Sequence, residues 1–424
     1  MKVVFLVGYE KINERLYNSG VTLQRHGCTI TTLLWRRGMI KEVQRTPEED
    51  EAMGAMYIGP GSSGGGLALL GSFVAFHRAA YRALVDERPD VLHVAHLILL
   101  PLAIRLKGRL KCRVIYDAYE FHAFSIAERL SRFMPFALAK RIMYAAEGAL
   151  IRRCDGVVTI DSNSGVLKRR YLQNTRNVEV LFNVPPAELE IDSGVRASVG
   201  MRYDGIPLIL YVGGVTREKG GLRMVAALSE VRRRVPNARL LIVGRFRAGG
   251  EREFWALAER VGVEDAIDMV DWQPFGVMCA YMATASVGLA LYNDSPRFRL
   301  LGGGNGRKLF MYMYFGVPIV MTEMGAVGRI VAEEGCGLLV PTDKRERMAD
   351  AIVRLLEDKG LNARMGRAGR AAIRRQYNWG AEKGKLLEVY RSAGAKLPNL
   401  QERDRGGDGH GRACPESWAC HPDR

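Results

Sequence analysis

Short apolar runs that predict strands alternate with helical segments along nearly the whole chain, and this alternation constrains the fold most. In the first half the runs are KVVFLVG, CTITTLLW, PDVLHVAH, CRVIYDAYEFH and CDGVVTID, and in the second half they are PLILYVGG, ARLLIVG, AIDMVDW, VGLALY, GVPIVMT and GLLVP. Continuous apolar runs suit strands that are buried on both faces, as in parallel sheets. We therefore predict an α/β fold with two doubly wound, Rossmann-like parallel sheets.

A break between the two sets of strands divides the chain into domains. At 424 residues the chain is too long for one core, and Pro185 and Pro186 interrupt regular structure between the two sets. The final residues are rich in glycine, proline and charge, which predicts disorder. We predict a first domain over 1–186, a linker over 187–206, a second domain over 207–376, a C-terminal helix over 377–396 and a disordered tail over 397–424. Two such sheets bind ligands outside the carboxyl ends of their strands, so we expect the domains to face a cleft.

The positive charge of the chain favours an acidic partner. The net charge is +16 and the pI is near 9.6, which fits nucleic acid, an anionic membrane surface or a phosphorylated substrate. The excess is spread out and no nucleic-acid motif accompanies it, so we expect no nucleic acid as partner. The stretch 126–153 carries basic residues around FMPFALA, which fits either a solvated helix face or a membrane-facing amphipathic surface.

Cysteine usage and the lengths of the apolar runs bear on localisation. Seven cysteines lie far apart, mostly in apolar runs, which is typical of a reducing compartment. The amino-terminal apolar run is too short for a signal peptide, and the longest apolar stretch, LHVAHLILLPLAI, is too short to span a membrane. We predict a cytoplasmic protein, peripheral at most on the inner face of the membrane.

A glycine turn with two cations lies at the start of the second half. In the segment YVGGVTREKGG, a strand ends at Gly213 and Gly214, and a turn with Arg217 and Lys219 leads into a helix. Glycines let backbone amides approach an anion, and the helix start adds partial positive charge. We interpret the turn as a phosphate site, with an ordinary strand-to-helix turn as the alternative. The spacing matches neither the dinucleotide fingerprint nor the P-loop.

A second glycine loop, GGGNGRKLF, also runs into a predicted helix. Two such helix starts in one domain suit a diphosphate that joins a nucleoside to another group. No Asp-x-Asp pair is present, so we expect no metal on the diphosphate and no other cofactor. The candidate donor-binding residues of the two loops are Gly213, Gly214, Gly303, Gly304, Asn305, Arg307 and Lys308.

Polar residues follow the strand ends of the first half as well. Asp117, Tyr119, Glu120 and His122 come at the end of one predicted strand, and Gly8 ends the first strand. The carboxyl ends of the strands form the ligand-binding edge of a doubly wound sheet, so these residues are candidates for a second site.

Taken in order, the motifs resemble a glycosyltransferase of the GT-B fold, similar to family 4 of the retaining enzymes. The segments that carry the resemblance are PDVLHVAH, VIYDAYEF, CDGVVTIDSNSGVLKRRY, VLFNVP, YVGGVTREKGG, LLIVG, KLFMYMYFGVPIV, GCGLLVP and QYNWGAEKGKLLEVY. Together they extend over about residues 1–395. Individually each is weak, and their order makes the fold signal strong.

The resemblance implies a nucleotide-diphosphate sugar as donor on the second domain. It implies a glycan or lipid-linked acceptor on the first domain, with a final helix packing back there, and a role in cell-surface polysaccharide or glycoconjugate synthesis. It further implies that Lys219, with Arg217, neutralises the departing diphosphate. The catalytic candidates are then Lys219, Arg217, Tyr119 and His122, and the acceptor candidates are Gly8, Asp117 and Glu120. We expect a metal-independent hexosyltransferase.

Two departures from the family pattern keep alternatives open. The family usually has an acidic pair eight positions apart, and those positions are Gly303 and Met311 in this chain. Relatives commonly have histidine where this chain has Tyr119, and a tyrosine is a poor base near neutral pH. The alternatives are a non-catalytic GT-B subunit that binds nucleotide, glycan or a partner enzyme, and another GT-B enzyme such as an epimerase or a phosphorylase.

Overall fold

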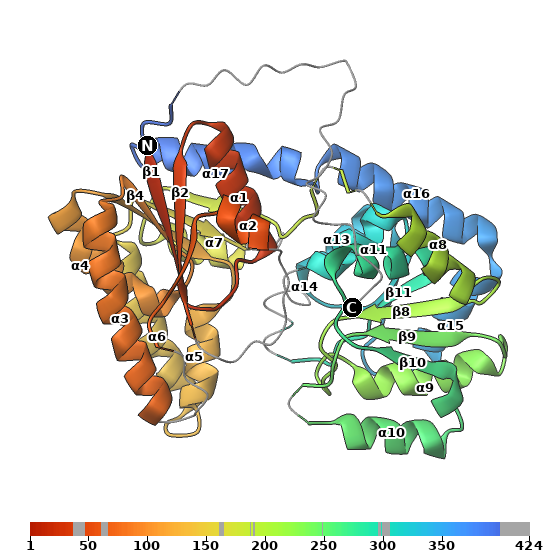
Figure 1. Ribbon diagram of the computed structural model, residues 1–424. Helices are drawn as coiled ribbons and strands as arrows, with labels where there is room; N and C mark the ends of the chain where they lie inside the picture. Colours follow the sequence, from red (N-terminus) through yellow and green to blue (C-terminus); the bar gives the residue numbers. More distant parts are fainter. Residues whose placement is uncertain are drawn as a thin grey trace, which may run out of the picture. The chain divides into compact units, whose positions relative to one another are not determined.

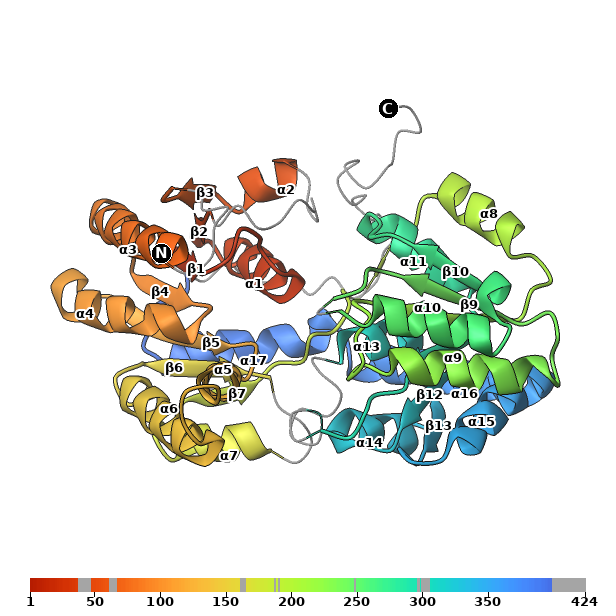
Figure 2. The ribbon, with the colours of Figure 1, turned by 90° about the horizontal axis from the view of Figure 1, so that it is seen from below.

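The computed structural model forms two compact units (Figures 1 and 2). The structure describes residues 1–36, 47–60, 67–160, 165–186, 188–189, 191–247, 249–295, 298 and 306–398. Unit 1 comprises Met1–Asp161, Gly165–Asn183 and the stretch that starts at Glu382, and unit 2 comprises Val184–Ala381. Each unit is an α/β layer structure with a parallel sheet.

Unit 1 contains a seven-stranded parallel sheet with the order β3-β2-β1-β4-β5-β6-β7. Its strands are β1 (Lys2–Val7), β2 (Thr29–Trp35), β3 (Ala55–Ile58), β4 (Val91–Val94), β5 (Arg113–Ala118), β6 (Gly156–Thr159) and β7 (Val178–Val180). β1 pairs with both β2 and β4, for example Phe5 with Thr32 and with His93. The chain therefore reverses its direction of winding between β1 and β4, which is where such sheets bind ligands.

The helices of unit 1 follow their strands in the βαβ manner. They are α1 (Glu14–Arg25), α2 (Pro47–Ala52), α3 (Leu67–Glu87), the 3₁₀ turn η1 (Leu97–Leu99), α4 (Leu100–Leu110), α5 (His122–Leu130), α6 (Phe136–Ile151) and α7 (Val166–Leu172). Helix α1 begins where the side chain of Asn13 caps the Leu16 amide at 2.9 Å. The interior strand residues, such as those of β1 and β4, are fully buried, as expected for a sheet covered on both faces.

The last described helix, α17 (Trp379–Ser392), belongs from Glu382 onward to unit 1. Glu382 accepts a hydrogen bond from the Phe182 amide at 3.1 Å. The Tyr390 hydroxyl lies 2.9 Å from Nδ1 of His93, which belongs to β4. Asn177 Nδ2 donates to the Val389 carbonyl at 2.8 Å. A helix from the far end of the sequence therefore completes the core of unit 1.

Unit 2 contains a six-stranded parallel sheet with the order β10-β9-β8-β11-β12-β13. Its strands are β8 (Leu208–Val212), β9 (Arg239–Val243), β10 (Ile267–Val270), β11 (Val287–Ala290), β12 (Ile319–Thr322) and β13 (Gly337–Val340). The direction of winding reverses between β8 and β11, because β8 pairs with both β9 and β11. The glycine turn that the sequence singled out follows β8 directly, at this reversal.

The helices of unit 2 are α8 (Ser193–Arg202), α9 (Gly221–Arg232), α10 (Glu251–Arg260), the 3₁₀ turn η2 (Glu264–Ala266), α11 (Phe275–Thr284), α13 (Arg307–Phe315), α14 (Gly325–Glu333), α15 (Arg345–Glu357) and α16 (Lys359–Arg375). Residues 187–206, which the sequence suggested as a linker, include α8, and α8 packs against α11 within unit 2. Asp192 caps α8 by accepting from the Val195 amide at 2.8 Å.

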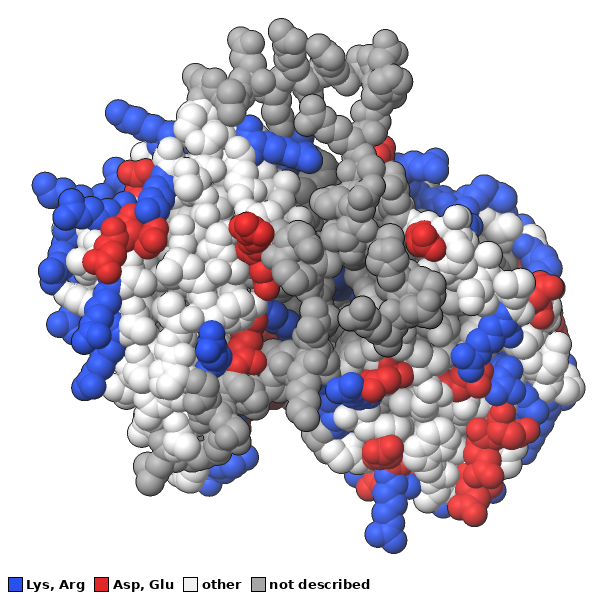
Figure 3. Space-filling model, viewed as in Figure 1, with Lys and Arg blue, Asp and Glu red and all other residues white. Residues whose placement is uncertain are grey.

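The surface charge and the helix lengths complete the description. On the face seen in Figure 3, Lys and Arg lie scattered over both units and are interspersed with Asp and Glu. None of the described helices is long and apolar enough to cross a membrane. The predicted disordered tail, 397–424, lies outside the described residues except for its first two positions.

Candidate functional site

The glycine turn of unit 2 requires glycine at its core positions. Gly213 and Gly220 have φ angles of +125° and +84°, which favour glycine. A Cβ on Gly220 would lie 1.8 Å from the Leu291 carbonyl oxygen just after β11, so any larger residue would push the turn away from the end of β11. The turn therefore holds the start of α9 tightly against the point where the sheet reverses its winding.

The backbone of the turn satisfies several of its own amides. The Lys219 amide donates to Thr216 Oγ1 at 3.1 Å, the Gly220 amide to the Arg217 carbonyl at 3.1 Å, and the Gly221 amide to the Thr216 carbonyl at 3.1 Å. The start of α9 therefore has fewer amides to offer an anion than the sequence suggested. The side-chain cations beside the turn remain as the main attraction for phosphate.

Lys308 brings a second cation to the turn from α13. Its Nζ lies 3.8 Å from the centroid of the Tyr211 ring, and a Cβ on Gly213 would lie 3.5 Å from Nζ. Burial first, and then the charge of Lys219, hold the pKa of Lys308 well below its usual range. The positive charges of Lys219 and Lys308 repel each other at this half-buried position, and one anion between them would stabilise both.

Arg247 lies across the same turn, although the sequence gave no direct indication of it. A Cβ on Gly214 would lie 2.9 Å from Arg247 Cδ and 3.1 Å from Nε, so the side chain fills the space above this glycine. The guanidinium lies 5.9 Å from the centroid of the Trp272 ring. The signal available in the sequence was RFRAGG, a basic glycine loop after β9, which parallels the turn after β8.

The structure places the other donor candidates at different positions. Arg217 is exposed and lines a narrow depression with Phe246 and Glu253, whose lining does not include Lys219 or Lys308. Arg307 opens α13 with its guanidinium 5.6 Å from the Phe275 ring. Gly303, Gly304 and Asn305 lie outside the described residues.

Met311, at the position of the family's carboxylate, is buried within α13. It is 2% exposed, and its neighbour Tyr312 bonds the backbone of β8 at Val212 (3.2 Å) and Leu210 (3.1 Å). The helix that carries Lys308 is therefore fastened directly to the strand that precedes the glycine turn. This contact fixes the start of α13, from which the Lys308 side chain extends, relative to the end of β8.

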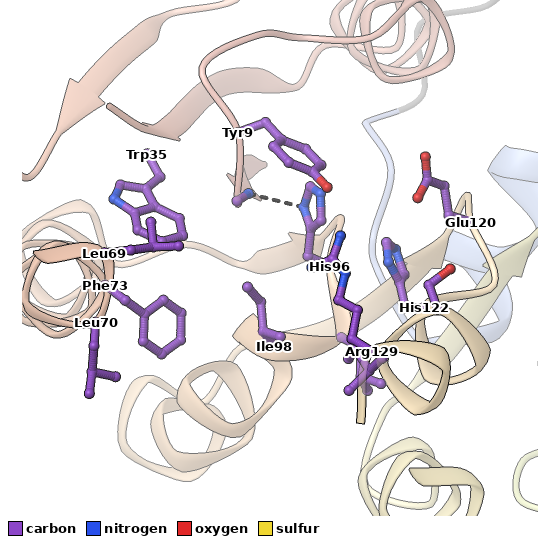
Figure 4. Close-up of a pocket in the computed structure, with 14 residues that line it drawn as sticks. Tyr9, Trp35, Leu69, Leu70, Phe73, His96, Ile98, Glu120, His122 and Arg129 are labelled. Carbon is purple, nitrogen blue, oxygen red and sulfur yellow. Dashed lines mark hydrogen bonds between the residues drawn. The ribbon is translucent and has the colours of Figure 1, made fainter. Parts of the chain in front are cut away.

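Unit 1 contains a pocket at the carboxyl ends of β1, β4 and β5, where its sheet reverses its winding (Figure 4). The cavity has a volume of about 380 Å³. Its lining residues are Gly8, Tyr9, Trp35, Leu69, Leu70, Phe73, His96, Leu97, Ile98, Glu120, His122, Ser125, Ile126 and Arg129. Three of the candidates from the sequence, Gly8, Glu120 and His122, line this pocket, and Asp117 and Tyr119 do not.

His122, which lines this pocket, has a buried ring nitrogen without a hydrogen-bond partner among the described residues. Its ring bonds the Ala95 backbone, and because this bond raises the pKa, a ring N–H donates to the carbonyl. Nε2 is buried with no hydrogen-bond partner among the described residues. Burial nevertheless lowers the pKa of His122 to about 4, so the ring is neutral at pH 7. With the proton on the other nitrogen, Nε2 is a free acceptor for a hydroxyl group.

Tyr119 and His96 form a fixed pair beside His122. The Gly8 amide donates to His96 Nδ1 at 3.0 Å, so in a neutral ring the proton lies on Nε2, which bonds the Tyr119 hydroxyl. Burial raises the pKa of Tyr119 well above its ordinary value. Tyr119 therefore cannot act as a base, and its contacts orient His96, whose ring centroid lies 5.2 Å from that of His122.

Asp117, at the end of β5, is buried in the core of unit 1 and does not line the pocket. Its carboxylate pairs with the buried guanidinium of Arg15 from α1 and lies 3.4 Å from His93 Nε2. Burial by itself would raise the pKa of Asp117, but Arg15, His93 and His122 together outweigh burial, and the pKa is lower than usual. His93 in turn contacts Tyr390, so this buried network ties α1, β4, β5 and α17 together.

Sequence reasoning missed most of the pocket wall. Trp35, Phe73 and Ile98 come from β2, α3 and η1, and Arg129 lies on α5, whose basic residues had suggested only a surface. His96 ends the strand segment PDVLHVAH. The rule that ligand-binding residues follow the carboxyl ends of parallel strands, which selected the residues after β5, would also have selected His96. Among the described residues no group of His, Cys, Asp or Glu side chains is arranged to hold a metal ion.

Comparisons with known proteins agree with this architecture. Residues 206–358 match the sequence profile of the family described as Glycosyl transferases group 1. D-inositol 3-phosphate glycosyltransferase of Segniliparus rotundus is 28% identical over 300 residues, 68% of this chain and 63% of the relative. GDP-mannose-dependent alpha-(1-6)-phosphatidylinositol monomannoside mannosyltransferase of Mycobacterium tuberculosis is 28% identical over 257 residues, 58% of this chain and 65% of the relative. The chain thus spans slightly less than two thirds of these relatives.

Solved structures with the same fold extend over nearly the whole chain. Sucrose-phosphate synthase of Thermosynechococcus elongatus has a TM-score of 0.70 at 18% identity, covering 93% of this chain and 100% of that one. Anabaena HepE in complex with UDP-glucose has a TM-score of 0.68 at 15% identity, covering 92% and 100%.

The chain has the GT-B fold, as its sequence predicted. Residues 206–358, in its second half, match the Glycosyl transferases group 1 family, so the family resemblance inferred from the motifs is confirmed.

Proposed function

We propose that the protein is a retaining, metal-independent glycosyltransferase that moves a sugar from a nucleotide-diphosphate sugar to a hydroxyl of a glycan or lipid-linked acceptor. The observation that carries the proposal is the cluster of Lys219, Lys308 and Arg247 around the glycine turn, inside the domain that matches Glycosyl transferases group 1. Positive charge held in place before the reaction stabilises a leaving diphosphate. The names of the relatives and neighbours, which mention GDP-mannose and UDP-glucose, support a nucleotide sugar as the donor.

Unit 2 would hold the donor through its diphosphate. Lys219 and Lys308 would contact the phosphate oxygens beside Gly213, and Arg247 would reach them across Gly214. As the bond between the sugar carbon and the phosphate oxygen breaks, negative charge grows on the diphosphate, and the cations stabilise it more strongly than in the ground state. Because the sugar hydroxyls have Met311 where the family has a carboxylate, they would depend on other partners.

Unit 1 would hold the acceptor in its pocket. A second hydroxyl of the acceptor would donate to His122 Nε2, which orients the acceptor, and Glu120 and Arg129 would hold neighbouring polar groups. His122 stays a positioning acceptor here, because a ring with a pKa of about 4 is a weak base at pH 7. In a retaining transfer of this type the departing phosphate oxygen takes the proton of the acceptor as the new glycosidic bond forms.

A surface formed by α6 and the connection between α5 and α6 supports peripheral attachment to the inner face of a membrane, with the protein otherwise in the cytoplasm. Phe133 is 79% exposed, and Leu138 and Ile142 on α6 are also exposed. Arg132 and Arg141 lie on the same stretch, so apolar contact and attraction to anionic lipid act together. Sedimentation with vesicles that contain phosphatidylglycerol should capture the wild type and release Phe133→Ser with Leu138→Ser. Equal capture of both proteins would rule out this surface.

The departures at Met311 and Tyr119 favour a second candidate, a GT-B subunit that binds a nucleotide or glycan without catalysis. The test is release of nucleoside diphosphate from GDP-mannose and UDP-glucose in the presence of extracted cell glycolipids. Release that Lys219→Ala abolishes, with an unchanged melting temperature, supports the transferase. Unchanged turnover in Lys219→Ala contradicts the assignment of the phosphate site. A rise in melting temperature with nucleotide, but no release with any donor, supports the second candidate.

A further inference from the structure

The pocket of unit 1 is divided into an apolar wall and a polar end (Figure 4). Trp35, Leu69, Leu70 and Phe73 gather on one side, and Glu120, His96 and His122 lie on the other, with Ile98 between them. The two sides come from different elements, the wall mainly from β2 and α3 and the polar end from the segments that follow β4 and β5, including the start of α5. One ligand that fills this pocket has to present both kinds of surface.

The apolar wall is rigid at its base and open at its rim. Trp35 is buried, stacks on Phe76 with ring centroids 5.3 Å apart, and donates from Nε1 to Ser72 Oγ at 3.2 Å. Leu70 on the first turns of α3 is 57% exposed, and Ile98 is 38% exposed. Large apolar side chains that line a pocket and continue to its rim favour a ligand with an apolar part that extends out of the pocket.

The polar end contains groups that a ligand would satisfy. His122 is 8% exposed with its Nε2 unpartnered, and the Ser125 hydroxyl is likewise buried without a hydrogen-bond partner among the described residues. Both side chains line the cavity. Buried polar atoms are nearly always paired in folded proteins, so unpaired atoms on side chains that line a cavity point to a ligand that supplies hydroxyl groups.

We infer that the acceptor is an amphiphile, with a hydroxyl-bearing head at His122 and Ser125 and an apolar chain along Trp35, Phe73 and Leu70. This inference rests on the proposed function and chooses between its two acceptor classes. A purely polar glycan would place its hydroxyls against the apolar wall without hydrogen bonds, which is unfavourable. A cavity of about 380 Å³ holds the head and the first part of the chain. The rest of the chain continues past the exposed Leu70.

The test compares acceptors that differ only in their apolar part. A series of alkyl mannosides and alkyl glucosides from methyl to octyl, used below their critical micelle concentrations, serves as probe with the full-length chain. Release of nucleoside diphosphate gives kcat/KM, and calorimetry without donor gives Kd. Each methylene that becomes fully buried should improve both quantities by about fourfold until the chain outgrows the wall.

Leu70→Ser and Phe73→Ser should flatten this dependence on chain length. Leu172→Ser is the matched control, because Leu172 is an exposed leucine of the same unit on α7, outside the pocket lining, and it should keep the wild-type slope. The inference is overturned if each added methylene changes kcat/KM and Kd of the wild type by a factor near one. It is also overturned if the two wall variants keep the same fold-change per methylene as the wild type. Chain-length-dependent binding without any sugar transfer would instead refute the proposed function and leave the amphiphile site in place.

Discussion

Replacing Lys308 by methionine separates the stability of unit 2 from its function. Methionine keeps most of the unbranched side-chain volume and removes the amine. The lowered pKa of Lys308 means that the folded protein as a whole disfavours the charged amine, in spite of the Tyr211 ring below it. Lys308→Met should therefore stabilise the free protein by about 1 kcal/mol, a rise in Tm of roughly 2 to 4 °C for a unit of this size.

The same change should weaken donor binding strongly. A charge-assisted contact to phosphate is worth about 1.5 to 3 kcal/mol, so loss of the amine should raise the Kd for a nucleoside diphosphate about 10- to 100-fold. Calorimetric titration with GDP and UDP measures the affinity, and differential scanning calorimetry measures Tm. Lys344→Met, at an exposed position before α15, is the control and should alter neither quantity.

The pH dependence gives an independent check on the same amine. In the free protein Lys308 loses its proton at a lower pH than an ordinary lysine, whereas a bound diphosphate restores the proton. Affinity should therefore fall as pH rises through the lowered pKa, and binding should take up protons in that window. Titration in buffers with different heats of ionisation measures this uptake, which Lys308→Met should abolish. A variant that binds GDP and UDP as tightly as the wild type, or loses stability, would refute this reasoning.

Three further predictions address the remaining groups. In the wild type the buried His122 ring has a pKa of about 4 when folded and about 6.5 when unfolded, so the free energy of unfolding falls by on the order of 3 kcal/mol as pH falls through this window. His122→Gln should remove this pH dependence, which urea unfolding at each pH measures. Arg247→Met should raise the Kd for UDP about tenfold without lowering Tm, and an unchanged Kd would show that Arg247 only packs on Gly214. Gly220→Ala should lower Tm by many degrees, because its Cβ would collide with the Leu291 carbonyl; a Tm within 2 °C of the wild type would contradict the strain argument.

The sequence by itself determined the fold class and the two loops at which chemistry gathers. The order of buried strands follows from local composition, because a strand covered on both faces has to be apolar throughout, as in β1 and β8. The glycine turn was equally visible, since Gly213 and Gly220 adopt backbone angles that favour glycine. Edge elements with weaker patterns, such as β3 and α8, escaped notice because half-exposed segments lack that signature.

Only the tertiary structure decided which side chains meet. Asp117 and His122 lie five positions apart in the sequence. Asp117 nevertheless forms an ion pair with Arg15 from α1, whereas His122 lines the pocket. Lys308 and Arg247 come to the turn after β8 from other strands' loops, and Trp35 and Phe73 meet His122 across one cavity. These contacts join residues tens to about a hundred positions apart in the sequence. Local propensity carries no information about such pairings, because they depend on the order in which the strands assemble and on the volume that the packed helices leave open.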